Sequence, residues 1–422
     1  MFFVASFVFQ ANKASAVEFE FYYQKIVEVK TINEDIESDD SLWTKFKKTV
    51  KKGVNAVKRT WEDVVTRNLA LGEGEKTWYS KEDHNLAYKV ERVKVSTEAE
   101  LLAAMGVKSE DELNNGQKAM LEVFRNSQNE AIQAEAKIGY LPKVHVILSD
   151  TTGYDDSSKY PNVRKDFWPY SSGLTINLST NCYNYPNSAE DAVSTLVHEF
   201  AHSLDMTFKE MKNPYGLDGS HYGNEITGKR AAFVEAWAEY NEMIASEKEA
   251  QSILNNTKVL CEESKDVAGS YTTNIKEEDA TADQLQRSEA HLAKLLYLIS
   301  TDPEIENGKD KVYKAFTSTR WNVLRTMPTL IKKFVKQNPE DTEAVCRIVD
   351  EVFLGKLSEE EFYKYVGKNK TTQAYWENRG KETEEENKDI DASKIKNQEI
   401  EDNVSSGTTV IIETDNNDPF AE

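Results

Sequence analysis

The spacing of apolar residues changes along the chain from strict alternation to helical periodicity. Residues 17–30 (VEFEFYYQKIVEVK) alternate apolar and polar positions and are rich in aromatic and β-branched types, which predicts a strand. Residues 43–65 instead place Trp43, Phe46 and Val50 three or four positions apart, as in an amphipathic helix with basic residues on its other faces. Such a helix can lie on an anionic membrane surface or bind an acidic partner. The simpler expectation is that its apolar face packs on the rest of this chain.

Further along, two predicted strands precede a long series of predicted helices. Residues 97–136 indicate two helices that separate near residues 114–116. Residues 141–150 (LPKVHVILSD) and 173–180 (GLTINLST) predict strands joined by a long loop. Helical patterns then continue to about Lys368. Strands followed by a run of helices favour an α+β fold.

Composition narrows the classes of protein that this chain can belong to. With 39% hydrophobic residues among 422, the chain can build at least one large core. A net charge of −21, from 73 acidic and 52 basic residues, excludes a general nucleic-acid binder because phosphates repel such a surface. The three cysteines lie far apart and form no CxxC pair, so stability comes from packing rather than from a disulfide framework.

The two ends of the chain differ from its middle. Residues 1–16 combine an apolar run with Ala14-Ser15-Ala16, which is typical of a secretory signal and predicts a secreted protein; a buried first strand is the alternative. No later segment reaches the roughly 20 apolar residues of a membrane span. Residues 371–422 hold fourteen acidic and five basic residues, which predicts a disordered acidic tail. Between the ends we expect an N-terminal region, 17–115, and a main domain, 116–370.

The segment STLVHEFAHSLD (residues 194–205) carries the strongest chemical signal. Ser188 and Asp191 stand at capping-box spacing before a run of apolar residues, so the segment is predicted to be helical. His198 and His202 then lie one turn apart on one face and can bind a single metal ion. Glu199 is rotated by roughly 100° from His198, which keeps it off the metal but within reach of a water bound there. The competing interpretation, two buried core histidines, leaves a costly polar cluster among apolar neighbours.

A catalytic zinc site needs a third protein ligand, and the segment AFVEAWAEY supplies two candidates. Glu235 and Glu239 lie one turn apart on a largely apolar predicted helix. We expect one to bind the ion and the other to hydrogen-bond a ligand histidine, although both could be solvated helix residues.

Three further residues are candidates for supporting roles. Asp205, three positions after His202, could fix the tautomer of that ring, or be an ordinary helix carboxylate. His221 and Tyr222 lie in a glycine-containing loop between the two predicted ligand helices, where either could stabilise an oxyanion opposite the metal.

Together these segments resemble the gluzincin metallopeptidases, and among them the branch typified by the catalytic domain of anthrax lethal factor and the Pro-Pro endopeptidases. The resemblance rests on HEFAHSLD (pattern HExxHxxD), on Tyr222-Gly223 and on FVEAWAEY. It implies a zincin-like domain with a small mixed sheet, an active-site helix and a helical C-terminal part. It also implies that Glu235 is the ligand, that Glu239 supports a ligand, and that Tyr222 stabilises the oxyanion.

The resulting hypothesis is a secreted endopeptidase that holds one Zn²⁺ per chain with His198, His202 and Glu235 and uses Glu199 as general base. Its substrate is a protein or peptide. A non-catalytic binding protein on the same scaffold is one alternative, in which residues 43–65 and the acidic tail contact the partner. A zinc aminopeptidase is another, but it requires an acidic anchor for a free amino terminus.

Overall fold

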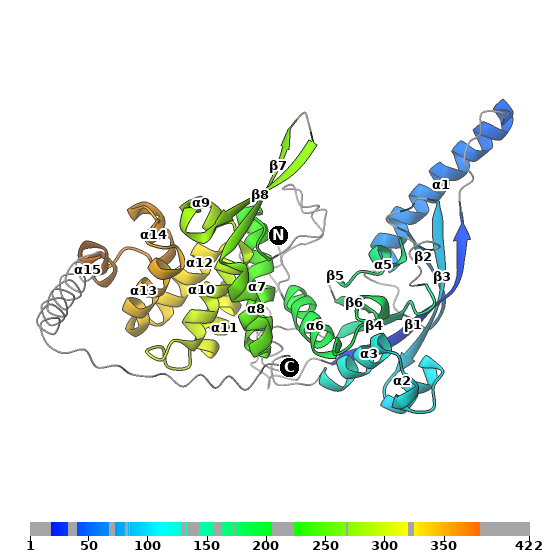
Figure 1. Ribbon diagram of the computed structural model, residues 1–422, viewed down its shortest axis with the longest axis horizontal. Coiled ribbons are helices and arrows are strands. Elements are labelled where there is room, and N and C mark those ends of the chain that lie inside the picture. The colour runs from blue at the N-terminus through cyan, green and yellow to red at the C-terminus, as the bar shows by residue number, and fades with distance from the viewer. Residues whose placement is uncertain are drawn as a thin grey trace, which may run out of the picture. The chain divides into compact units, whose positions relative to one another are not determined.

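The computed structural model describes residues 18–32, 40–66, 72–80, 83, 85–127, 132, 143–154, 160, 162–172, 174–204, 223–266, 269–319 and 325–379 of the chain. The chain divides into two units between Gly367 and Lys368. The first unit contains an α+β arrangement, with a mixed sheet followed by a largely helical part (Figure 1). The expected α+β class is therefore confirmed.

A six-stranded sheet forms the first half of this unit. Its strands, in spatial order, are β2 (Gly74–Tyr79), β3 (Leu86–Val95), β1 (Phe19–Thr31), β4 (Val144–Asp150), β6 (Thr175–Ser179) and β5 (Tyr170–Ser172). The pairs β1–β4 and β4–β6 are parallel and the other pairs are antiparallel. Strands predicted at 17–30, 141–150 and 173–180 correspond to β1, β4 and β6. The sheet joins strands from both sides of residue 115, so the expected division at that point passes through one sheet.

The central strands carry almost continuous buried residues. All five residues of β6 are buried, as are all those of β4 except His145. Two of the buried polar residues among them are hydrogen-bonded in sequence: Ser149 donates to Asn177, and Asn177 donates to the carbonyl of Phe167. The helices that accompany the sheet are α2 (Glu98–Met105), α3 (Asn115–Asn126), α5 (Val163–Asp166) and α6 (Ala189–Leu204). The predicted break near residues 114–116 is the start of α3, where Asn114 and Gln117 form a capping box.

Helix α6 lies between the sheet and the helical part (Figure 1). Phe200 packs its ring against Phe19 of β1, with ring centroids 5.2 Å apart, and is fully buried. On the other side α6 contacts α7 (Lys229–Ala245). Ser188 precedes α6 as expected, but its hydroxyl donates to the carbonyl of Tyr183. The helix therefore bridges the two halves of the unit.

The helical part contains the helices and the hairpin that follow α6 in the first unit. They are α7, α8 (Glu247–Asn256), the hairpin of β7 (Val259–Asp266) and β8 (Gly269–Lys276), α9 (Ala282–Leu285), α10 (Glu289–Thr301), α11 (Gly308–Thr319), α12 (Met327–Gln337), α13 (Thr342–Val352) and α14 (Glu359–Val366). At the centre, Trp237 of α7 stacks on Phe316 of α11 with centroids 3.5 Å apart and planes 10° apart. Helix α7 is thus fixed between α6 and a fully buried aromatic core.

Helix α1 (Leu42–Thr66) departs from expectation. Those of its apolar side chains that the structure describes, up to Val57, are exposed: Trp43 and Phe46 are 63% and 57% exposed. The expectation that this apolar face packs on the rest of the chain is wrong.

In the second unit the described residues form α15 (Lys370–Asn378). This helix occupies the first residues of the segment, 371–422, that composition predicts to be a disordered tail. Residues 1–16 and 380–422 lie outside the described part, and so does the predicted secretory signal. Among the described residues, no helix combines the length and apolarity needed to cross a membrane.

Candidate metal centre

Helix α6 presents the two histidines because its apolar and polar positions separate cleanly. Leu196, Val197 and Phe200 are fully buried, and they fix the rotation of the helix against its neighbours. Glu190 and Asp191 occupy its first turn, where carboxylates are favoured by the helix dipole. With this face buried, His198 and His202 point toward α7, one turn apart.

Three side chains from α6 and α7 converge on one point. Nε2 of His202 lies 3.1 Å from Nε2 of His198 and 3.0 Å from Oε2 of Glu235. Nε2 of His198 lies 3.4 Å from the same carboxylate oxygen. Ligand atoms roughly 2.0–2.1 Å from a tetrahedrally coordinated ion lie about 3.3 Å from one another, so these three atoms are spaced as three corners of such a tetrahedron. Among the residues that the structure describes, these three form the group that could hold a metal ion.

Glu242 orients the first of these histidines. Its Oε2 lies 3.0 Å from Nδ1 of His198, while its Oε1 accepts a hydrogen bond from the hydroxyl of Ser194 at 3.1 Å. A carboxylate at Nδ1 favours the tautomer that leaves the Nε2 lone pair available to a metal. Sequence reasoning missed Glu242, although it lies seven residues after Glu235 and three after Glu239, and therefore on the same face of α7.

Several carboxylates gather in this largely buried site. Burial alone lowers the pKa of His198, but the carboxylates of Glu242, Glu235 and Glu199 outweigh burial and raise that pKa well above its usual value. Burial also raises the pKa of Glu239 well above its usual range, and the carboxylate of Glu289 adds to this effect. Several carboxylates in one low-dielectric site repel each other unless a cation or protons compensate them. The charge of the site therefore suits a bound cation.

Glu199 lies beside the candidate metal ligands without being one of them. It is 8% exposed and lines a cavity of about 440 Å³ together with His198 and Glu242. Trp168, Tyr183 and Tyr185 are also in the wall of this cavity. Burial raises the pKa of Tyr183 well above its usual value. Sequence reasoning did not single out Tyr183, which precedes α6 by several residues.

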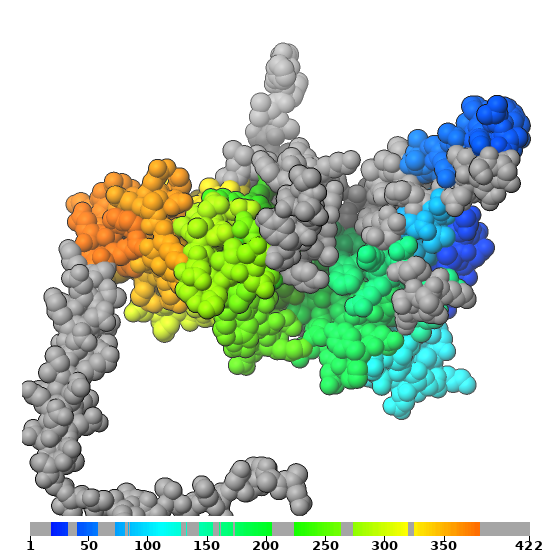
Figure 2. All heavy atoms as spheres, turned by 45° about the horizontal axis from the view of Figure 1, so that its top comes forward, coloured from blue at the N-terminus to red at the C-terminus, as the bar shows by residue number. Residues whose placement is uncertain are grey.

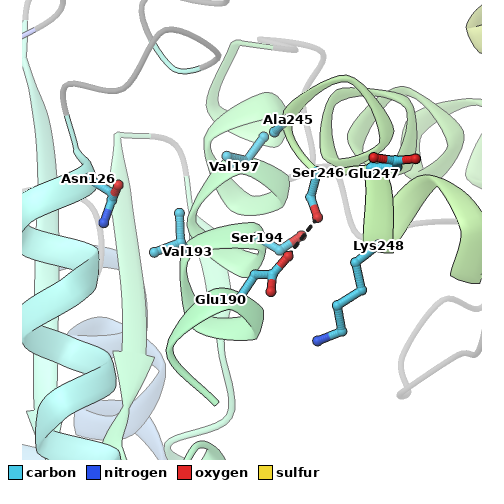
Figure 3. A pocket seen from close by; sticks show the side chains of 9 residues that line it. All are labelled: Asn126, Glu190, Val193, Ser194, Val197, Ala245, Ser246, Glu247 and Lys248. Carbon is cyan, nitrogen blue, oxygen red and sulfur yellow. Dashed lines mark hydrogen bonds between the residues drawn. The ribbon is translucent and has the colours of Figure 1, made fainter. Parts of the chain in front are cut away.

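A second cavity, of about 380 Å³, lies on another side of α6 (Figure 3). Asn126, Val193 and Ser194 line it together with residues at the junction of α7 and α8, where Ser246 donates a hydrogen bond to Glu190. Ser194 lines both cavities and bonds to Glu242. Ser194 is therefore shared by the two cavities, whereas His198 and Glu242 line the first one.

The other predicted site residues are only partly described. Asp205, His221 and Tyr222 lie outside the described residues. Gly223, the second residue of the Tyr-Gly pair, lies so close to Glu239 that a methyl group in its place would collide with that carboxylate. Glu239 is 7% exposed and lies one turn from Glu235 on α7. The contact with a ligand histidine that we expected of Glu239 is made at His198 by Glu242.

The sequence and the structure were compared with known proteins. No protein-family model, curated protein or solved structure matches this chain significantly.

Proposed function

We propose that this protein is a zinc-dependent endopeptidase of the gluzincin type, with one zinc ion per chain. The observation that carries the proposal is the convergence of His198, His202 and Glu235, with Glu199 in the wall of the adjoining cavity. Two imidazoles and one carboxylate at tetrahedral spacing are the ligand set of many catalytic zinc sites, which leave the fourth position open. A site that only stabilises a fold has no need of a carboxylate directly after the first ligand.

In this proposal His198, His202 and Glu235 would hold the ion. Bound zinc would act as a Lewis acid on the scissile carbonyl and lower the pKa of a water molecule. Glu199 accepts the proton of the attacking water and later delivers it to the leaving amine. Glu242 keeps the ring of His198 in the required tautomer and orientation. Asp205 and Tyr222 lie outside the described residues, so their assignment as helpers rests on the sequence alone. Glu239 lies on α7 one turn from Glu235, and its assignment as a helper rests on the sequence resemblance.

The substrate in this proposal is an extended peptide. The cavity is lined by Trp168 and Pro169, which immediately precede β5, the last strand of the described sheet. Ser171 of β5 is hydrogen-bonded to Ser203 of α6 at 2.9 Å, so the strand lies alongside the ligand helix. An extended peptide can add to the outer edge of such a strand. β6 is paired on both sides, with β4 and β5, so β5 rather than β6 offers an edge to a peptide.

The substitution Glu199→Gln tests the proposal directly. We expect hydrolysis of a peptide library, followed by mass spectrometry, to fall by roughly 10²–10⁴-fold, because general acid–base catalysis contributes about that much. Zinc content, measured by elemental analysis, should stay at one ion per chain. Glu247→Gln, which changes an exposed glutamate of α8, is the matched control and should cleave normally.

Three outcomes would contradict the proposal. If the Glu199→Gln variant cleaves at the full rate, Glu199 is not the general base. A purified protein with neither stoichiometric zinc nor cleavage would instead be the non-catalytic binding protein. Trimming of peptides with free amino termini, but not of amino-terminally acetylated ones, would identify an aminopeptidase.

Secretion is part of the same proposal and rests on residues 1–16 alone. A mature protein whose sequence begins at Val17 in the culture medium would support it. Retention of the full-length chain in the cell would contradict it.

A further inference from the structure

Helix α1 exposes a continuous apolar stripe. The side chains of the stripe recur at three- and four-residue spacing and are each about half exposed or more: Trp43 63%, Phe46 57%, Val50 48%, Val54 50% and Val57 71%. The rings of Trp43 and Phe46 stack with centroids 5.6 Å apart. Large exposed apolar patches on soluble domains mark surfaces that bind something. Figure 2 shows α1, in blue, at the surface of the molecule.

The polar face of α1 is the one turned to the protein. Lys48 forms an ion pair with Asp40 at 2.8 Å, and both side chains are largely buried. Asn55 donates a hydrogen bond to the carbonyl of Ile32 at the end of β1. Thr44, Lys45 and Lys52, on the same face, are also less exposed than the apolar stripe. Asn55 therefore places this polar face toward the end of β1, and the apolar stripe lies on the opposite, exposed face.

The charge of α1 indicates what covers the stripe. The helix carries seven basic residues and two acidic ones, in a chain whose net charge is −21. Lys47 and Lys51 are exposed and border the stripe along one side, and the ammonium of Lys47 lies over the ring of Trp43, 5.3 Å from its centroid. An apolar stripe bordered by lysines is complementary to a surface with an apolar interior and anionic headgroups.

A second copy of the chain fits this surface less well. Two α1 helices paired through their stripes would bring their basic residues together, and like charges at an interface oppose association. We therefore propose that α1 binds in the plane of an anionic phospholipid membrane, with Trp43, Phe46 and the three valines inserted among the headgroups. This membrane contact is independent of the metal centre and would hold the enzyme at a lipid surface.

Vesicle flotation with the full chain tests the proposal. Vesicles of phosphatidylcholine alone are compared with vesicles of equimolar phosphatidylcholine and phosphatidylserine. We expect binding to the anionic vesicles only, and a partition coefficient that falls about tenfold or more in Val54→Ser/Val57→Ser, because two apolar side chains leave the lipid. The control Val27→Ser/Val93→Ser changes two exposed valines of the sheet and should bind like the parent chain.

A second matched pair of variants tests the contribution of the lysines of α1 to membrane binding. Lys47→Gln/Lys51→Gln should weaken binding severalfold, whereas Lys108→Gln/Lys118→Gln, which removes the same charge from exposed positions elsewhere, should not. Circular dichroism and zinc content verify that each variant is folded. Every variant retains residues 1–16, so any lipid affinity of that segment is the same throughout.

The result that would overturn the proposal is equally specific. The proposal is contradicted if the chain does not bind vesicles, if it binds both kinds of vesicle equally, or if the control variants lose as much binding as the α1 variants. A dimer in sedimentation equilibrium that dissociates in Val54→Ser/Val57→Ser would identify a second copy as the occupant. Binding to poly-glutamate but not to anionic vesicles would identify an acidic polypeptide.

Discussion

Oε2 of Glu242 lies 3.0 Å from Nδ1 of His198, so a carboxylate on α7 orients a candidate metal ligand on α6. The same carboxylate is held through its other oxygen by Ser194. Side-chain contacts across two packed helices thus determine which nitrogen of His198 is available to a metal.

The substitution Glu242→Gln should weaken zinc binding by about 10–100-fold, because partners of metal-bound histidines have effects of that size. Competition with a chromophoric chelator measures the affinity. Glu247→Gln removes an exposed glutamate five residues further along and should leave the affinity unchanged. Equal affinities for the two variants would show that Glu242 does not orient the ligand.

Removing the carboxylate of Glu235 or of Glu239 should affect zinc affinity differently. Glu235→Gln should weaken zinc binding by more than about 100-fold, since the loss of a direct ligand exceeds the effect of losing a ligand's partner. Glu239→Gln should retain one zinc ion per chain because its carboxylate is not among the three converging groups. The same chelator competition compares both variants. Zinc loss in Glu239→Gln alone would reverse the assignment.

Glu239 also gives the metal-free protein a specific dependence on pH. Burial raises the pKa of Glu239 well above its usual value of 4.5. The folded protein therefore keeps a proton that the unfolded chain releases, so this group's contribution to stability is full below the unfolded pKa and is lost as pH rises. In chelator, Glu239→Gln should gain stability relative to the parent chain between about pH 5 and about pH 8. Urea unfolding at both pH values measures the difference, and a constant difference would contradict the ionisation of a buried Glu239.

The aromatic stack behind α7 is expected to account for much of the stability of the helical part. Phe316→Ala removes a ring that is 1% exposed and stacks on Trp237, which should cost roughly 3–5 kcal/mol of unfolding free energy. Phe46→Ala makes the same change at a side chain that is 57% exposed on α1, and surface changes of this kind cost about 0.5 kcal/mol or less. Denaturant unfolding of the two variants provides the comparison. Similar losses would mean that α7 is not held by this stack.

Local patterns in the sequence were sufficient for several parts of the structure. The alternation of apolar and polar residues predicted β1 from residues 17–30 and β6 from residues 173–180, and the largely apolar segment 141–150 predicted β4. The spacing of His198 and His202 already implied a shared face, because positions four apart on a helix are neighbours. These features depend on residues close together in the chain, so the sequence alone determines them.

Other parts depended on contacts between distant segments. Glu235, Glu239 and Glu242 share one face of α7, and helical spacing cannot tell which of them meets α6. Likewise the periodicity of residues 43–65 predicted an amphipathic helix but not that its polar face would bind Asp40 and Ile32. The sequence by itself determined β1, β4, β6 and the helix of the two histidines, and the types of candidate ligand that the helices carry. Only the tertiary structure decided which glutamate completes the site and which face of α1 remains exposed, because both depend on how rigid elements pack against partners far away in the chain.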